Sequence, residues 1–268
     1  MPDLANKVFL SPAMSEVIPK FRAAYAKPFA LAEKLNELAH RETFATKVNH
    51  RDAQCLLVAC LLQRALTTFQ GVILLCERGM PSEATTLLRT LLDVMFRVVA
   101  IAKDPEVWRA FILEDEVHRK KFINKFKLLS PSAQSGVGNP TLDSLLATIR
   151  QKIETSDIRE LKTQWFAERA DLADFYHSAY SVFSGTVHAN VRDLERALIL
   201  DAEGEVSGFN YGPTDAGLDT LLLTAMESLI LCLRGAFSVL PSTSQGALDA
   251  VHAEFTSLHK EVYPENET

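Results

Sequence analysis

The chain has little cysteine, and none of it is paired at metal-binding spacing. Four cysteines occur among 268 residues, at positions 55, 60, 76 and 232, and no two of them form a Cys-x-x-Cys motif. The spacing therefore gives no sign of a disulfide framework or of a cysteine metal motif. We expect the four thiols to behave as small buried hydrophobic groups in a reducing cytosol.

The chain also lacks an excess of positive charge, a secretory leader and an unbroken apolar run. Its net charge of −6 gives no general attraction to nucleic acid. Residues 1–12 contain no basic segment followed by an apolar one, so no signal peptide is predicted. Polar side chains such as Gln63 and Arg64 interrupt the most apolar segment, 55–76, which favours a buried helix over a membrane span. We expect a cytoplasmic protein that makes no membrane contact.

Helical periodicity runs through almost all of the remaining sequence. Hydrophobic residues make up 47% and charged residues 23%, which is typical of a soluble globular protein. Gly79 followed by Pro81, and Asp104 followed by Pro105, mark the ends and starts of helices. The predicted helices cover residues 13–48, 51–78, 81–103, 105–128, 141–154, 158–168, 171–192, 214–240 and 244–262.

One segment breaks this periodicity, and no other feature divides the chain. Residues 197–211 predict a small β-hairpin or an ordered loop. There is no internal repeat, no long linker and no set of strands that could build a sheet. The sequence therefore predicts a single all-α multi-helix bundle over residues 1–268, with an N-terminal helical arm at 1–50 and a bundle core at 51–268.

The predicted helix 171–192 has a polar face without charge. Its apolar face consists of Leu172, Phe175, Ala179, Val182, Phe183, Thr186 and Val187, and its polar face of His177, Tyr180, Ser181, Ser184 and His188. No Lys, Arg, Asp or Glu occurs between Phe175 and Asn190. Because a solvated helix face normally carries long charged side chains, another helix covers this polar face or the face lines a pocket.

The predicted helix 81–103 offers partners for that uncharged face. Its far side carries Glu83, Arg89, Asp93 and Arg97. We predict that His177, Tyr180, Ser184 and His188 meet Arg89 and Asp93 across one seam. In such a pocket the histidine would act as acid or base, the aspartate would orient it, and the arginine would hold an anion. The alternative is a polar network that only packs the bundle.

The predicted helix 105–128 carries a carboxylate inside an apolar stripe. Trp108, Phe111, Ile112, Phe122 and Phe126 share one face, and Asp115 lies in the middle of it. Because a buried carboxylate needs a partner, we predict that Asp115 pairs with Arg119 or with another base at the edge of the core.

Three further patterns are weaker. A hydrolase site built from Ser184, His188 and Asp93 is not favoured, because the sequence contains no nucleophile elbow. Asp115-x-x-His118 and Asp174-x-x-His177 approach the pattern of a di-iron bundle but lack an inward pair of Glu residues. The basic run 118–127 could touch phosphates, but its Phe residues fit a core better. We therefore expect no metal and no cofactor.

Two blocks of the sequence carry a resemblance. ERGMPSEATTLLRTLLDV (77–94) and the later Tyr180-x-x-x-Ser184-x-x-x-His188 are similar to an uncharacterised family of all-helical bacterial domains, over roughly residues 50–210. The resemblance implies a cytosolic helical domain without an agreed activity. Its candidate residues are Glu83, Arg89, Asp93, Tyr180, Ser184 and His188.

The chain also distantly resembles the HEPN helical bundles of ribonucleases, toxins and phage-defence systems. HEPN ribonucleases carry Arg-x4–6-His on a late helix, whereas here Arg169 precedes His177 by eight positions and His188 comes before Arg192. We therefore expect an accessory or effector domain of a bacterial stress or phage-defence system that binds a nucleotide, RNA or protein partner. Alternatives are a non-catalytic structural protein and, less favoured, a metal-dependent helical-bundle enzyme.

Two further expectations concern the assembly of the chain and its site. The chain self-associates as a two-fold homodimer, because its uncharged helix face needs a cover. If a site exists, its candidate catalytic residues are His188, Ser184, Tyr180 and Asp93, and its candidate ligand-binding residues are Arg89, Glu83, Asp115, Arg119 and His177.

Overall fold

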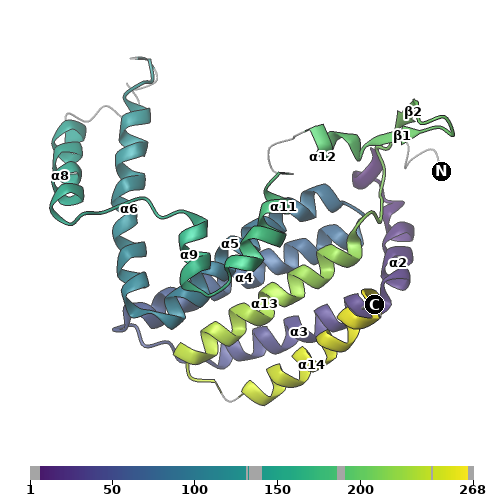
Figure 1. Cartoon of the computed structure of the whole chain (residues 1–268), viewed down its shortest axis with the longest axis horizontal. Coiled ribbons are helices and arrows are strands. Elements are labelled where there is room, and N and C mark those ends of the chain that lie inside the picture. The colour runs from purple at the N-terminus through teal and green to yellow at the C-terminus, as the bar shows by residue number, and fades with distance from the viewer. Residues whose placement is uncertain (1–6, 131, 133–140, 186–190, 243, 265–268) are drawn as a thin grey trace.

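The computed structural model describes residues 7–130, 132, 141–185, 191–242 and 244–264, and nearly all of its elements are helices (Figure 1). In chain order they are η1 (Val8–Leu10), α2 (Met14–Ala24), α3 (Ala26–Ala45), α4 (Ala53–Glu77), α5 (Pro81–Lys103), α6 (Pro105–Phe126), α8 (Thr141–Thr155), α9 (Thr163–Arg169), α10 (Ala173–Phe175), η2 (Tyr176–Tyr180), α11 (Ser181–Ser184), α12 (Val191–Glu195), β1 (Leu198–Leu200), β2 (Val206–Phe209), α13 (Leu218–Val239) and α14 (Gln245–Val262). The predicted all-α class with a small hairpin is confirmed. β1 and β2 pair antiparallel, with Leu198 opposite Phe209.

Three long helices, α4, α5 and α13, form the centre of the protein. α4 and α5 make an antiparallel hairpin that turns at Gly79, whose φ of 67° is a left-handed conformation. A Cβ at this position would lie 2.9 Å from both Pro213 and the backbone nitrogen of Thr214, so the turn requires glycine. Thr214 donates a backbone hydrogen bond to the Gly79 carbonyl at 3.0 Å. This bond joins the start of α5 to the segment that leads into α13.

α5 and α13 run parallel, so their N-terminal ends lie at the same end of the protein. At the other end Gly235 of α13 approaches α5 closely, because a Cβ there would lie 3.3 Å from the Cα of Val99. On the core side of α5, Leu88, Leu92 and Met95 are fully buried. The shared N-terminal end of the two helices is where the candidate site lies.

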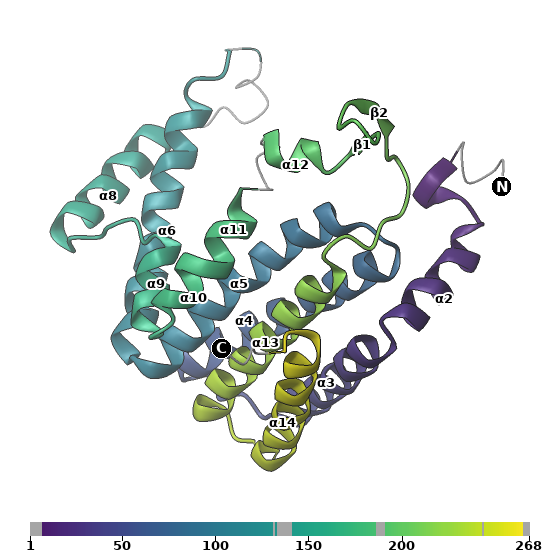
Figure 2. The ribbon, with the colours of Figure 1, turned by 45° about the vertical axis from the view of Figure 1, so that its right-hand side comes forward.

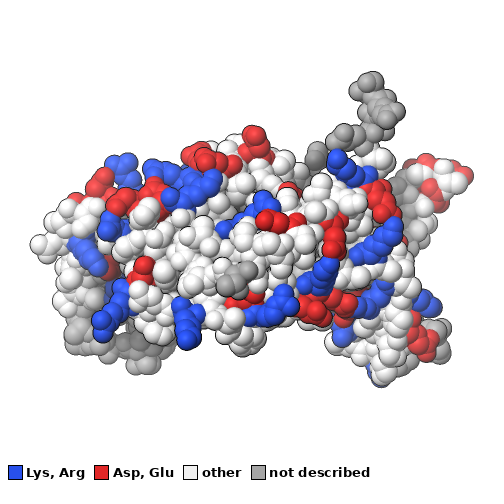
Figure 3. All heavy atoms as spheres, turned by 90° about the horizontal axis from the view of Figure 1, so that it is seen from below, with Lys and Arg blue, Asp and Glu red and all other residues white. Residues whose placement is uncertain are grey.

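A single large hydrophobic core joins α3, α4, α5, α13 and α14, and α9 and α11 also contribute to it. Phe29 and Leu35 of α3, Phe69 of α4 and Leu222 of α13 are buried in it together. α14 and α3 lie side by side below the central layer in both ribbon views (Figures 1 and 2). Seen from below, the surface carries acidic and basic side chains that are interspersed (Figure 3). That face shows no large area of a single sign.

α4 and α13 are also long and apolar enough to cross a membrane, judged by length and composition alone. Their most apolar 18-residue windows have a mean hydropathy of 1.5, and 39% and 56% of those windows is buried within the protein. Both helices contribute to the single core described above, as core helices of soluble proteins do. α4 is nevertheless less enclosed than its sequence predicts, because Leu56, Cys60 and Leu74 are exposed.

The expected burial of all four cysteines is therefore only half right. Cys76 and Cys232 are buried, but Cys60 is exposed and Cys55 is half-buried. Burial raises the pKa of the Cys76 thiol to about 12 and also raises that of Cys232. The exposed Cys60 follows from the position of α4, which has one face at the surface.

α6 and α8 form a helical hairpin that projects from the rest of the protein (Figures 1 and 2). Its own small core consists of Ile123, Leu146 and Ile149, with Ile153 packed against it. Glu116 of α6 is buried and accepts a hydrogen bond from Lys152 of α8 at 2.6 Å. The Lys152 ammonium lowers the pKa of the Glu116 carboxyl, because it favours the charged form.

The predicted burial of Asp115 is wrong, because α6 is rotated from the expected orientation. Asp115 is exposed, whereas its neighbours Glu114 and Glu116 are buried. Glu114 accepts the backbone N–H of Leu161 at 2.7 Å, and Arg119 pairs with Glu116 at 3.2 Å. The predicted Asp115–Arg119 pair therefore does not form within the described part of the chain.

Candidate functional site

The segment predicted as one helix over 171–192 is instead a series of short elements. α10 leads into the single π-helical turn η2 and then into α11, and residues 186–190 lie outside the described residues. The Ser181 hydroxyl donates to the carbonyl of Tyr176 at 3.0 Å, five residues back. The wider turn brings the rings of Tyr176 and Tyr180 into a stack with centroids 5.0 Å apart.

This turn changes which side chains face the core. Tyr180, predicted on the polar face, is buried and meets the ring of Phe96 edge-on at 6.0 Å. Val182, predicted on the apolar face, is exposed. A prediction with one continuous period of 3.6 residues cannot place both correctly, because a π-turn inserts an extra residue into the period.

Three of the predicted site residues do meet across the α5–α11 contact. The guanidinium of Arg89 lies over the ring of Tyr180, with Cζ 5.1 Å from the centroid. Its Nε also donates to the hydroxyl of Ser184 at 3.3 Å. We call Arg89, Tyr180 and Ser184 together the arginine seam.

Asp93 lies in a neighbouring network that the sequence did not predict. Its carboxylate pairs with Arg97 one turn along α5 and accepts a 2.6 Å hydrogen bond from the hydroxyl of Thr163. Thr163 in turn accepts a long hydrogen bond from the Tyr180 hydroxyl, at 3.5 Å. Arg97 lies over the ring of Phe166, 4.8 Å from its centroid. No sequence signal marked Thr163, because it is the first residue of a short helix predicted to begin earlier.

Of the two histidines expected beside Asp93, the structure describes one. His177 is exposed, and its ring contacts that of Tyr176, 5.3 Å away. His188 lies outside the described residues. Among the described residues Asp93 bonds to Thr163 and Arg97, and Ser184 bonds to Arg89.

The remaining candidates divide between two places. Asp115 and Arg119 lie on the projecting α6 and do not line the seam or the pocket described next. Glu83 is exposed in the first turn of α5 and lines that pocket. Among the described residues no group of three His, Cys, Asp or Glu side chains is arranged to hold a metal ion.

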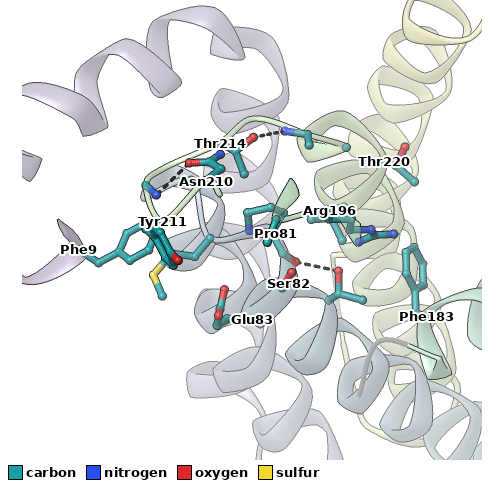
Figure 4. Close-up of a pocket in the computed structure, with 18 of the residues that line it drawn as sticks. Phe9, Pro81, Ser82, Glu83, Phe183, Arg196, Asn210, Tyr211, Thr214 and Thr220 are labelled. Atoms are coloured by element: carbon teal, nitrogen blue, oxygen red, sulfur yellow. Dashed lines mark hydrogen bonds between the residues drawn. The ribbon is translucent and has the colours of Figure 1, made fainter. Parts of the chain in front are cut away.

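A pocket of about 490 Å³ lies at the shared N-terminal end of α5 and α13 (Figure 4). Phe183 of α11 forms part of its wall, so the pocket adjoins the arginine seam. Its polar lining residues are Ser82, Glu83, Thr85, Arg196, Asn210, Tyr211, Thr214 and Thr220. Figure 4 shows Phe9 and Tyr211 together at one end of the pocket and Arg196 with Phe183 at the other.

Neither helix that begins at this pocket has a side-chain cap. The N-cap residues are Met80 for α5 and Gly217 for α13, and neither makes a side-chain cap bond. In α13 the N–H of Leu218 is bonded to the backbone carbonyl of Asp215 at 3.1 Å. The first-turn N–H groups of a helix have no acceptor within the helix, and the aligned peptide dipoles place positive charge there. Two such ends and the guanidinium of Arg196 favour an anion at this pocket, whereas the first-turn carboxylates of Glu83 and Asp219 oppose one.

The sequence marked only part of this pocket. Glu83 was a candidate, but Arg196, Asn210 and Tyr211 were not, because they follow α12 in a segment interpreted as a hairpin or loop. The Gly79–Pro81 signal did identify the start of α5. This local signal does not reveal that α13 runs parallel to α5, an arrangement that brings the start of a second helix to the same pocket.

Residues 56–206 match a family described only as a family of unknown function (DUF5677). The matched segment contains α5 and α11, and with them the arginine seam, but it ends before α13. No curated protein and no solved structure matches the chain.

Proposed function

The chain belongs to this family of unknown function (DUF5677), and we propose that it binds a small anionic ligand of the nucleotide class at the shared start of α5 and α13. The observation that carries the proposal is the convergence of two uncapped helix N-termini on one pocket. Backbone N–H groups at helix starts are a recurrent binding site for phosphate. Ser82 and Thr220, from the two first turns, both line this pocket.

The two ends of the pocket suit the two ends of a nucleotide. The aromatic rings of Phe9 and Tyr211 offer a surface on which a base can stack, and the Asn210 amide can bond to a base edge. At the opposite end Arg196 can pair with phosphate oxygens. Glu83 carries a negative charge, so it favours hydroxyl or amino groups of the ligand over a second phosphate.

The arginine seam has a positioning role in this proposal. Arg89 is held by Tyr180 and Ser184 and therefore fixes α11, whose Phe183 forms part of the pocket wall. We place the protein as an HEPN-like accessory or effector domain of a bacterial stress or phage-defence system. The helical fold and the resemblance of its sequence support that wider role, and the absence of the Arg-x4–6-His spacing argues against ribonuclease activity.

Calorimetric titration of the full chain with ATP, adenosine and inorganic phosphate tests the proposal. ATP should bind at least about tenfold more tightly than adenosine, because the helix ends and Arg196 recognise its phosphates. Arg196→Gln should weaken ATP binding by about tenfold, or roughly 1.4 kcal/mol. Arg150→Gln, at an exposed position of α8, is the matched control and should leave binding unchanged.

A second pair of variants separates binding from stability. Ser82→Asp places a carboxylate in the first turn of α5, where it should stabilise the helix but repel the ligand. Ser82→Asn, which has a similar shape without charge, should bind ATP nearly as well as the wild type does. The proposal is overturned if ATP does not bind at millimolar concentration, or if neither Arg196→Gln nor Ser82→Asp weakens it.

A specific observation favours a protein partner as the second candidate function. α12 and the hairpin expose large apolar side chains beside the pocket, namely Val191, Leu194, Ile199, Leu200 and Phe209. Exposed apolar groups that lie together are characteristic of interaction surfaces. In that case the protein is a non-catalytic interaction module, and Leu194→Ser with Phe209→Ser would abolish capture of a partner while ATP binding persisted.

A further inference from the structure

α6 carries an apolar stripe that the described part of the chain leaves uncovered. Ile112 is 45% exposed and Phe122 is 69% exposed. The ring of Phe126 stacks on that of Phe122, with centroids 6.5 Å apart. These are the residues that sequence periodicity predicts to face the core, and here they face solvent instead.

The two other sides of α6 are covered within the chain. α8 packs on the side that carries Glu116 and Ile123. The segment that leads from α8 to α9 packs on the side that carries Glu114, which accepts the N–H of Leu161, and Lys121, which pairs with Glu160. The exposed stripe is therefore a separate third face of the helix.

Two opposite charges lie at the middle of this stripe. Asp115 is exposed and has no hydrogen bond or ion pair with any other residue that the structure describes. Arg119 is one turn further along, half exposed, and its bond to Glu116 is long at 3.2 Å. Glu116 is also held by Lys152 at 2.6 Å, so Arg119 can turn outward without leaving that carboxylate unpaired.

The order of residues along the stripe is self-complementary for an antiparallel pair of helices. If a two-fold axis passes through the middle of α6 at the level of Val117, residues at equal distances on either side of it face each other. The facing pairs are then Ile112 with Phe122 and Asp115 with Arg119, each of them twice. Phe126 would face Trp108, which also packs against the main core of its own chain. A two-fold interface requires such matching of a surface with itself.

We propose that a second copy of this chain docks on the α6 stripe and forms an antiparallel two-fold dimer. In this dimer Asp115 of each copy pairs with Arg119 of the other, between two clusters of apolar side chains. A lipid surface fits the stripe poorly, because it would bury Asp115 without a partner. A nucleic acid fits it poorly as well, because the same carboxylate would face the phosphates.

Sedimentation equilibrium of the full chain over micromolar concentrations tests this interface. One pair of helices buries less than the roughly 800 Å² per partner of a standard interface, so a Kd in the micromolar range is expected. Asp115→Arg should weaken the dimer at least about tenfold, because two like-charge contacts replace two ion pairs. Arg119→Asp should do the same for the same reason.

The decisive variant combines the two changes. Asp115→Arg with Arg119→Asp exchanges the charges and restores both intermolecular pairs, so the dimer should return to near wild-type affinity. Glu203→Arg, on an exposed turn of the hairpin, changes the net charge equally to Asp115→Arg and should have no effect. Thermal melts of each variant report whether the fold is intact.

Several results would overturn this proposal. A wild-type chain that stays monomeric at 100 µM (roughly a hundredfold above the expected Kd) would do so. A dimer that is indifferent to Asp115→Arg, or one that the double exchange fails to restore, would place the interface elsewhere. Binding of vesicles or of RNA by a monomeric protein through the same stripe would show that a different partner occupies it.

Discussion

Replacing Asp93 by alanine tests whether the polar network on α5 holds α9 in place. The carboxylate makes a charge-assisted hydrogen bond with Thr163 of α9 and an ion pair with Arg97 of its own helix. The side chain of Asp93 is 28% exposed and that of Arg97 is 18% exposed, so water screens the pair only partly. The change therefore removes two partly buried interactions and leaves a guanidinium over the ring of Phe166 without its carboxylate.

The expected cost follows from these two interactions. A hydrogen bond to a charged group contributes about 1.5–3 kcal/mol, and stranding a charge that is only partly buried adds less than it would in a dry core. We expect Asp93→Ala to lower the free energy of unfolding by about 2–3 kcal/mol. Asp93→Asn keeps an acceptor for Thr163 and loses only the charge, so it should cost roughly half as much.

Urea unfolding at pH 7, followed by circular dichroism, measures these differences. Arg97→Met removes the stranded cation, so Asp93→Ala should cost about 1–2 kcal/mol less in that background than in the wild type. Asp174→Ala, an exposed carboxylate nearby on α10, is the control and should change stability by less than about 0.5 kcal/mol. If Asp93→Ala is no more costly than this control, and independent of Arg97, the network does not hold α9.

Three other carboxylates give further predictions. Glu42 is buried and accepts hydrogen bonds from Ser242 and Ser244, so Glu42→Ala should cost about 2–3 kcal/mol in the same unfolding assay. Burial raises the pKa of the Glu227 carboxyl, so its ionisation at pH 7 opposes folding. Glu227→Gln should therefore raise Tm by a few degrees at pH 7. It should give no gain below about pH 4, where this carboxyl is protonated in both the folded and the unfolded chain. Lys152 lowers the pKa of the Glu116 carboxyl, so this carboxylate stabilises the fold above about pH 4.3, and the stabilisation is lost as the pH falls through the lowered pKa. Amide hydrogen exchange in α8 should therefore accelerate at low pH, and the acceleration should be smaller in Glu116→Gln.

Much of the fold could be predicted from local sequence signals. α5 begins at Pro81 and ends at Lys103 as predicted, because Gly79 provides the left-handed turn and Asp104 caps the next helix by accepting the N–H of Glu106 at 2.9 Å. Such signals act over a few residues and need no knowledge of distant segments. Residues 13–48 are different: they form two helices, α2 and α3, which are separated at Tyr25 and not at Pro19 or Pro28.

The candidate site was predicted only in part, because it depends on contacts between distant segments. Arg89, Tyr180 and Ser184 were expected to meet and do so, since an uncharged polar face and an unpaired arginine need each other. Among the described residues, the Asp93 carboxylate bonds to Thr163 and pairs with Arg97. Within the π-turn at 176–180, Tyr180 is buried and His177 is exposed, and no single-sequence rule predicts such a turn.

The α6 helix shows why periodicity alone cannot identify a core. Periodicity correctly places Ile112, Phe122 and Phe126 on one face with Asp115 between them, but the described part of the chain does not cover that face. If the stripe were buried within one chain, Asp115 would need a basic partner inside the core. If two copies share the stripe, the Arg119 of the second copy would be that partner. In the proposed dimer, the Asp115 carboxylate would set the register of the two α6 helices. We also predict that Asp115→Leu costs the monomer little free energy of unfolding, because no described residue pairs with the Asp115 carboxylate.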